Sequence, residues 1–169
     1  MGRYQPGLID ATVRHVREKP GMVIFDMAES FNMLRGKHVD TAVIGAFEVS
    51  EKGDVANWGF EYPPKHSGIS MGGGFDTVVG PKRCIVAINH LDKYGKSKIV
   101  KKLRYPLTGA SGYVDLVITD LAVMEVKGPK GKKDGLILKE IAPGWTAEEV
   151  QMITEAKLEV SPDLKEYEL

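Results

Sequence analysis

The chain has 169 residues, of which 43% are hydrophobic and 27% charged, a balance typical of a globular domain with a buried core. Lys plus Arg and Asp plus Glu both total 23, so net charge gives no reason to expect a nucleic-acid tail or attraction to anionic membranes. No apolar run approaches membrane-spanning length, the N-terminus lacks the apolar core of a signal peptide, and the lone Cys84 cannot form an internal disulfide. We therefore expect one domain over residues 1–169 in a reducing cytoplasm.

The first part of the chain predicts strands that alternate with a helix. Met22 to Phe25 is a short apolar run and predicts a strand. Asp26 is placed to cap a helix over residues 28–35, which Gly36 would end. Residues 40–47 predict a second buried strand. This strand, helix, strand order is typical of a parallel sheet with a crossover connection.

The second part of the chain is richer in strand signals. Residues 114–126 predict either one long strand or two joined by a bend, and residues 136–141 alternate in a way that predicts a hairpin back onto them. Thr146 and Glu149 form a capping-box pattern that opens a short helix. The remaining predicted elements are strands over residues 83–88, 98–103 and, as an edge strand, 158–162.

Three consecutive glycines, Gly72, Gly73 and Gly74, are the most unusual local feature. Without Cβ atoms, their backbone N–H groups are open to close approach, and glycine adopts positive φ at little cost. Because Phe75 looks like the start of a helix, we expect a nest of N–H donors suited to an anion or oxyanion. The alternative interpretation is a flexible surface turn.

A long segment over residues 48–70 precedes the glycines and lacks apolar periodicity, which predicts a functional loop. Loops 45–58 and 67–76 are expected to converge beyond the carboxyl ends of the strands, where ligands of open α/β sheets bind. His90, at the end of its own strand, could join them. Trp58 could stack on an adenine or line an acyl pocket, with simple packing as the alternative.

Glu48 and Glu51 are the carboxylates best placed for acid, base or nucleophile chemistry, although solvated charges just past a strand are the more common outcome. The four histidines have no partners at zinc-ligand spacing, so no metal site is expected. The sequence also lacks the Gly-x-Ser-x-Gly elbow of serine hydrolases.

Six segments of the sequence form one recognisable pattern; they are, in order, residues 30–40, 45–58, 71–76, 105–109, 118–123 and 160–164. Taken together, they resemble the B (beta) subunits of class I coenzyme A-transferases, most closely the succinyl-CoA:3-oxoacid and 3-oxoadipate type. The likeness runs over about residues 8–165, with residues 1–7 as a lead-in.

The resemblance implies an α/β fold of the CoA-transferase kind, with an open mixed or parallel sheet and flanking helices. It also implies an A-subunit partner, a homo- or hetero-oligomer, and transfer of CoA from an acyl-CoA to a 3-oxoacid through a glutamyl-CoA intermediate. Coenzyme A is then a substrate, with no cofactor and no metal. The site residues that it implies are Gly72 and Gly73 as backbone oxyanion donors, with Asn57, Trp58, Gly74, Phe75 and Glu48 at the substrate or CoA.

The sequence departs from the family pattern at the catalytic residue. The family's nucleophile lies in a Glu-Asn-Gly motif upstream of the part matched by residue 8, and this sequence contains no such motif. The chain could be a fragment of such a B subunit, need another polypeptide for the missing part, or be a non-catalytic relative that binds CoA esters or stabilises an assembly. Glu48 as a substitute nucleophile is a fourth option. Smaller departures are Glu48, commonly Gln in the family, and Ser70, commonly Gly.

Overall fold

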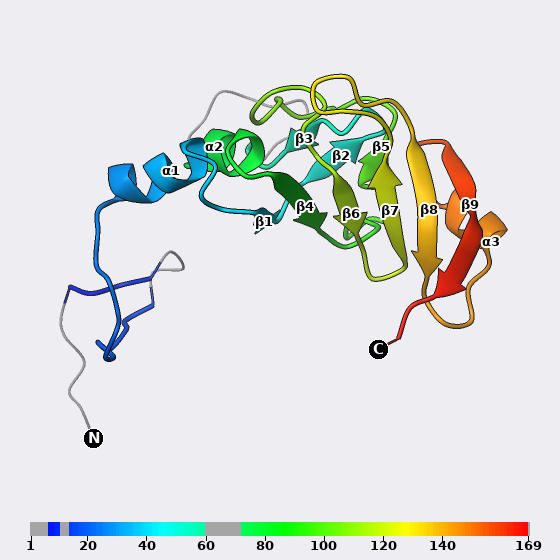
Figure 1. The fold of residues 1–169 in the computed structure, drawn as a ribbon. Coiled ribbons are helices and arrows are strands. Elements are labelled where there is room, and N and C mark those ends of the chain that lie inside the picture. The colour runs from blue at the N-terminus through cyan, green and yellow to red at the C-terminus, as the bar shows by residue number, and fades with distance from the viewer. Residues whose placement is uncertain (1–6, 11–13, 60–71, 169) are drawn as a thin grey trace. The chain divides into compact units, whose positions relative to one another are not determined.

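The computed structural model describes residues 7–10, 14–59 and 72–168 (Figure 1). The chain divides into two compact units, Met1–Ser30 and Phe31–Leu169. The described residues of the first unit hold one isolated bridge, between Ile9 and His15, and no strand. The strand predicted over residues 22–25 is therefore wrong, and Val23 and Ile24 are exposed. An apolar run becomes a strand only where a neighbour accepts its backbone hydrogen bonds, and the described part of this unit offers none there.

Helix α1, Met27–Arg35, begins as its sequence predicts. Asp26 Oδ1 accepts a hydrogen bond from the Glu29 N–H at 2.8 Å, which confirms the predicted cap. At the other end, Lys37 rather than Gly36 takes the left-handed conformation, with φ of 61°. The His38 N–H then reaches back to the Met33 carbonyl at 3.0 Å and closes the helix.

The second unit contains a six-stranded mixed sheet. Its strands β1, β4 and β6 are parallel, β6, β7 and β8 are antiparallel, and β9 lies parallel to β8 at the edge. In sheet order they are β1 (Thr41–Ile44), β4 (Arg83–Ala87), β6 (Leu116–Ile118), β7 (Ala122–Val126), β8 (Leu136–Ile141) and β9 (Leu158–Glu166). The predicted mixed α/β fold is confirmed, and residues 114–126 form two strands rather than one.

Two of the three strands of a second sheet lie within the segment that we expected to be a loop. Strand β2 (Glu48–Ser50) pairs antiparallel with β3 (Val55–Ala56) and parallel with β5 (Ile99–Val100). All seven of these strand residues are buried, so the segment has strand structure without the alternation of a half-exposed strand. The small sheet fixes the chain that leads into Asn57.

Two short helices flank the strands. Helix α2, Gly74–Val79, lies in the connection that runs from β3 to β4 and starts where the glycine run ends. Helix α3, Ala147–Met152, has the predicted capping box: Thr146 Oγ1 accepts from the Glu149 N–H, and Glu149 Oε2 accepts from the Thr146 N–H at 2.9 Å.

One buried cluster joins the two sheets. It takes Val49 and Val55 from the small sheet and Val86, Val117 and Met124 from the large one, all with no exposed surface. Burial of such side chains contributes about 1.5–3 kcal/mol each, so the two sheets stabilise each other. In the part of the chain that the structure describes, no helix has the length and apolar character needed to cross a membrane.

Candidate functional site

The glycine run lies against the segment that follows β3. A Cβ built on Gly74 would lie 2.8 Å from Thr108 Cγ2 and 3.1 Å from both Oδ1 and Nδ2 of Asn57. The absence of a side chain at Gly74 is therefore what allows the two segments to approach. The predicted convergence of the two loops is confirmed at Gly74, while residues 67–71, including Ser70, lie outside the described residues.

Thr108 fixes the position of Asn57. Its hydroxyl accepts a hydrogen bond from the Asn57 N–H at 3.0 Å and donates one to Asn57 Oδ1 at 2.8 Å. Its own N–H donates to the Val55 carbonyl at 2.8 Å, and the residue is fully buried. Thr108 was not predicted as a site residue. The one signal for it in the sequence is that it lies in the 105–109 segment, which carries part of the family resemblance.

The glycine loop has two different backbone conformations. Gly72 has φ of +53°, which glycine adopts at little cost, whereas Gly73 has an ordinary φ of −83°. Gly73 is the N-cap of α2, and its carbonyl accepts hydrogen bonds from the N–H and hydroxyl of Thr77. A glycine at this position brings no side-chain acceptor to the first turn of the helix. Phe75, in that turn, is half exposed.

Asp76, in the same turn, is held by α1. Arg35 Nε donates to Asp76 Oδ1 at 2.7 Å and Nη2 donates to Oδ2 at 2.9 Å, so both carboxylate oxygens are engaged. This two-bond contact with the guanidinium holds the pKa of the Asp76 carboxyl below its usual range. No sequence pattern predicted this pair, which joins residues 41 positions apart.

Trp58 directly follows Asn57 in the segment that leaves β3. Its indole N–H donates to the Leu107 carbonyl at 3.2 Å, which ties the ring to the same segment that carries Thr108. The side chain is only partly buried. Its contact with an adenine or acyl group stays a prediction.

Glu48 has a structural partner. Its Oε1 lies 2.5 Å from Arg104 Nε, and its Oε2 accepts a hydrogen bond from the Arg104 N–H at 2.9 Å. The residue is buried, with 3% of its surface exposed. A carboxylate engaged through both oxygens is a poor nucleophile, so the geometry disfavours Glu48 as a substitute for the family's glutamate. Its contact with substrate stays a prediction.

His90 turns into the protein instead of joining the loops. It is fully buried, with Nδ1 3.0 Å from Thr119 Oγ1 and Nε2 2.8 Å from Thr154 Oγ1. Removal from water lowers the pKa of the imidazole below its ordinary value. Both ring nitrogens thus connect the β6–β7 turn to the end of α3, and we assign His90 a structural role.

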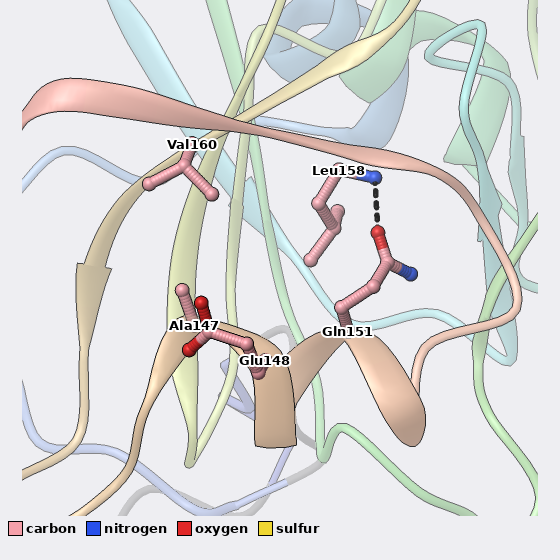
Figure 2. Close-up of a pocket in the computed structure, with 5 residues that line it drawn as sticks. All are labelled: Ala147, Glu148, Gln151, Leu158 and Val160. Carbon is pink, nitrogen blue, oxygen red and sulfur yellow. Dashed lines mark hydrogen bonds between the residues drawn. The ribbon is translucent and has the colours of Figure 1, made fainter.

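A shallow pocket lies elsewhere, between α3 and β9 (Figure 2). Leu158 and Val160 point from β9 toward the helix, and Gln151 Oε1 accepts a hydrogen bond from the Leu158 N–H at 2.8 Å. None of the predicted site residues lines this pocket, which is completed by Ala147 and Glu148. Among the residues that the structure describes, no three His, Cys, Asp or Glu side chains gather so that they could hold a metal ion.

Comparison with known proteins identifies relatives over most of the chain. A sequence model of the family described as Coenzyme A transferase matches residues 6–152. The B subunit of the succinyl-CoA:3-ketoacid coenzyme A transferase of Helicobacter pylori is 41% identical over 159 residues, covering 94% of this chain and 72% of the relative. The B subunit of the 3-oxoadipate CoA-transferase of Pseudomonas putida is 39% identical over 158 residues, covering 90% and 68%.

A solved structure shares the fold. The acyl-CoA transferase YdiF of Escherichia coli O157:H7 superposes with a TM-score of 0.68 at 24% identity. The match covers 86% of this chain, which spans 31% of that longer chain. At this identity the likeness supports the fold alone.

Proposed function

Because the chain belongs to the coenzyme A transferase family and its relatives are B subunits, we propose that it supplies one wall of an active site that transfers CoA from an acyl-CoA to a 3-oxoacid. That wall consists of the glycine loop, Gly72 to Gly74, and the Asn57–Trp58 segment. The observation that carries the proposal is the close approach of Gly74 to Asn57. Gly74, the last residue of the glycine loop, lies against the side-chain amide of Asn57.

The chemistry requires stabilisation of a developing oxyanion. A carboxylate nucleophile adds to the thioester carbonyl, the C–S bond breaks, and a mixed anhydride and the CoA thiolate form. The thiolate then attacks the nucleophile's own carboxyl carbon, which releases the donor acid and leaves CoA on the protein as a thioester. The 3-oxoacid carboxylate takes up CoA by the reverse of these steps. Gly72 and Gly73 would donate backbone hydrogen bonds to the oxygen that carries the charge in each tetrahedral intermediate.

The nucleophile itself must come from elsewhere. The sequence has no Glu-Asn-Gly motif, and Glu48 is engaged by Arg104. We propose that additional polypeptide supplies the glutamate and that an A subunit, as the names of the relatives indicate for those proteins, completes the site. Succinyl-CoA, a 3-ketoacid and 3-oxoadipate are the substrates that these names favour.

The absence of that motif also favours a second candidate function, a non-catalytic module that binds CoA esters or stabilises an assembly. The two functions differ in one outcome. A transferase component forms a covalent CoA thioester once its missing parts are present, whereas a binding module holds acyl-CoA without turnover in the complete assembly.

The test is intact-mass analysis after incubation with succinyl-CoA or acetoacetyl-CoA. We expect no adduct on the 169-residue chain alone, and a CoA adduct on a version that is extended to include a Glu-Asn-Gly segment and mixed with an A subunit. Calorimetry with the same acyl-CoAs measures binding in each sample. Binding without an adduct in the complete assembly would favour the module, and an adduct on the chain alone, mapped to Glu48, would overturn the assignment of the nucleophile.

A further inference from the structure

The ring of Phe31 lies directly on Gly73. A Cβ built on Gly73 would overlap the Phe31 ring atoms Cζ and Cε1. The backbone of Gly73, with φ of −83° and ψ of 17°, is one that any residue can adopt. Phe31, and not backbone strain, is therefore the reason that residue 73 is a glycine. Gly72 is the opposite case, since its φ is +53° and no atom lies within 4 Å of a Cβ built there.

Helix α1 contacts α2 at further points beyond Phe31. Leu34 packs against Gly80, where a built Cβ would lie 2.8 Å from Leu34 Cβ. Between these two contacts, Arg35 engages both oxygens of Asp76. Residues 31–35 thus run beside α2 from the glycine loop to its far end (Figure 1).

Asp76 stands three residues after Gly73, where an acidic side chain commonly folds back onto the N-cap N–H. Helix α3 of the same chain shows that outcome, because Glu149 accepts a hydrogen bond from the Thr146 N–H at 2.9 Å. In α2 the equivalent carboxylate is turned to Arg35 instead. In α2 the acidic side chain pairs with a cation from another helix, whereas in α3 it caps its own helix.

We propose that Arg35 and Phe31 are positioning residues of the glycine loop: Arg35 holds Asp76 away from the Gly73 N–H, and Phe31 fixes the direction of that N–H. Neither side chain is assigned a contact with substrate. The inference rests on the proposed function, because the Gly73 N–H is one of the two donors to the oxyanion. It adds that a carboxylate and an arginine outside the glycine loop decide whether this donor is available.

The first test replaces Arg35, first alone and then together with its partner Asp76. In Arg35→Met we expect Asp76 to cap Gly73, so that the ¹⁵N-edited amide resonance of Gly73 shifts with pH as Asp76 ionises. This titration should be absent in wild type and in Arg35→Met/Asp76→Ala. Affinity for acetoacetyl-CoA, measured on the full chain with an A subunit, should fall roughly tenfold in Arg35→Met, as for one lost hydrogen bond to the thioester carbonyl, and return in the double variant.

Lys82→Met is the matched control, since the Lys82 side chain is about as exposed as that of Arg35 and forms its own ion pair, with Asp40. It should change neither the Gly73 resonance nor the affinity. If Asp76→Ala alone weakens binding as much as Arg35→Met, and the double variant binds no better, then the pair only stabilises the fold and the inference is wrong.

The second test measures coupling between Phe31 and Gly73. Gly73→Ala should lower the urea midpoint strongly in wild type and much less in a Phe31→Ala background. In that background the missing Phe31 ring leaves space for the added methyl group. Gly72→Ala is strained by its φ, but its added Cβ would have no atom within 4 Å, so it should lower the midpoint equally in both backgrounds. Equal losses for Gly73→Ala in the two backgrounds would contradict the role of Phe31. If wild type fails to bind acetoacetyl-CoA, the proposed function fails, while the resonance titration and this cycle still decide the inference.

Discussion

The side-chain amide of Asn57 lies against the backbone of Gly74, with both amide atoms 3.1 Å from the point where a Cβ would stand. This contact joins a segment that leaves the small sheet to the loop that opens α2, although the two residues are well separated in the sequence. It makes the glycine at position 74 a requirement of packing, and it sets the end of the glycine run beside the Asn57 amide.

Gly74→Ala should destabilise the protein and weaken acyl-CoA binding. The added methyl would lie 2.8 Å from Thr108 Cγ2, which is buried and cannot move away freely. Overpacking of this kind costs about 1–3 kcal/mol of unfolding free energy. Urea denaturation measures it, with Gly45→Ala as the control because a Cβ there meets nothing within 4 Å. Equal midpoints for the two variants would contradict the contact.

Thr108→Val should release Asn57 from its position. The substitution keeps the shape of the side chain but removes the hydroxyl that accepts from the Asn57 N–H and donates to Oδ1. Leaving these groups without a partner costs about 1–3 kcal/mol. Thr108→Ser retains the hydroxyl and should stay closer to wild type in both unfolding free energy and acyl-CoA affinity. A serine variant as weak as the valine variant would assign the effect to packing instead.

Arg104→Met should be more damaging than Glu48→Gln. Removal of Arg104 leaves the buried Glu48 carboxylate without its guanidinium partner, and breaking a buried pair in this way costs about 3 kcal/mol. In Glu48→Gln the amide oxygen can still accept from the Arg104 N–H, so the loss should be smaller. Thermal unfolding of both variants at neutral pH provides the comparison, and the reverse order would show that the pair does not hold the segment in place.

Stability should fall as the pH drops through the range in which histidine titrates. The pKa of buried His90 is lower in the folded protein than the ordinary 6.5, so the unfolded chain takes up the proton first. The contribution of neutral His90 is complete above pH 6.5 and is lost as the pH falls toward the folded pKa. Urea midpoints between about pH 7.5 and 5.5 should decrease in wild type and decrease less in His90→Gln. Parallel profiles would show that another group is responsible.

Local signals in the sequence predicted most of the elements whose formation depends on residues that are close in the sequence. The Asp26 cap of α1 and the capping box of α3 depend on residues within three positions, so the sequence alone shows them. The strand predicted at residues 22–25 was wrong because apolar character cannot supply a hydrogen-bonding neighbour. Strand β2 was missed because it is only three residues long and two of them, Glu48 and Ser50, are polar, although all three are buried.

For the site, the sequence predicted which segments would meet but not what holds them. The glycines and Asn57 were predicted from residue type and family resemblance. Thr108, Arg35 and Arg104 act on residues 51, 41 and 56 positions away, and no local pattern marks such partners. The same limit explains why His90, which follows a strand as a ligand-binding residue would, proved to be buried among threonines.

The most direct test of the central claim is an NMR titration of the full chain with acetoacetyl-CoA, in the presence of the proposed A subunit. If the glycine loop and Asn57 form one wall of the acyl-CoA site, the backbone amides of Gly72 and Gly73 and the side-chain amide of Asn57 should shift together and saturate at one dissociation constant. Saturable binding that leaves these three resonances unchanged and shifts others, such as Gln151 at the pocket between α3 and β9, would contradict it.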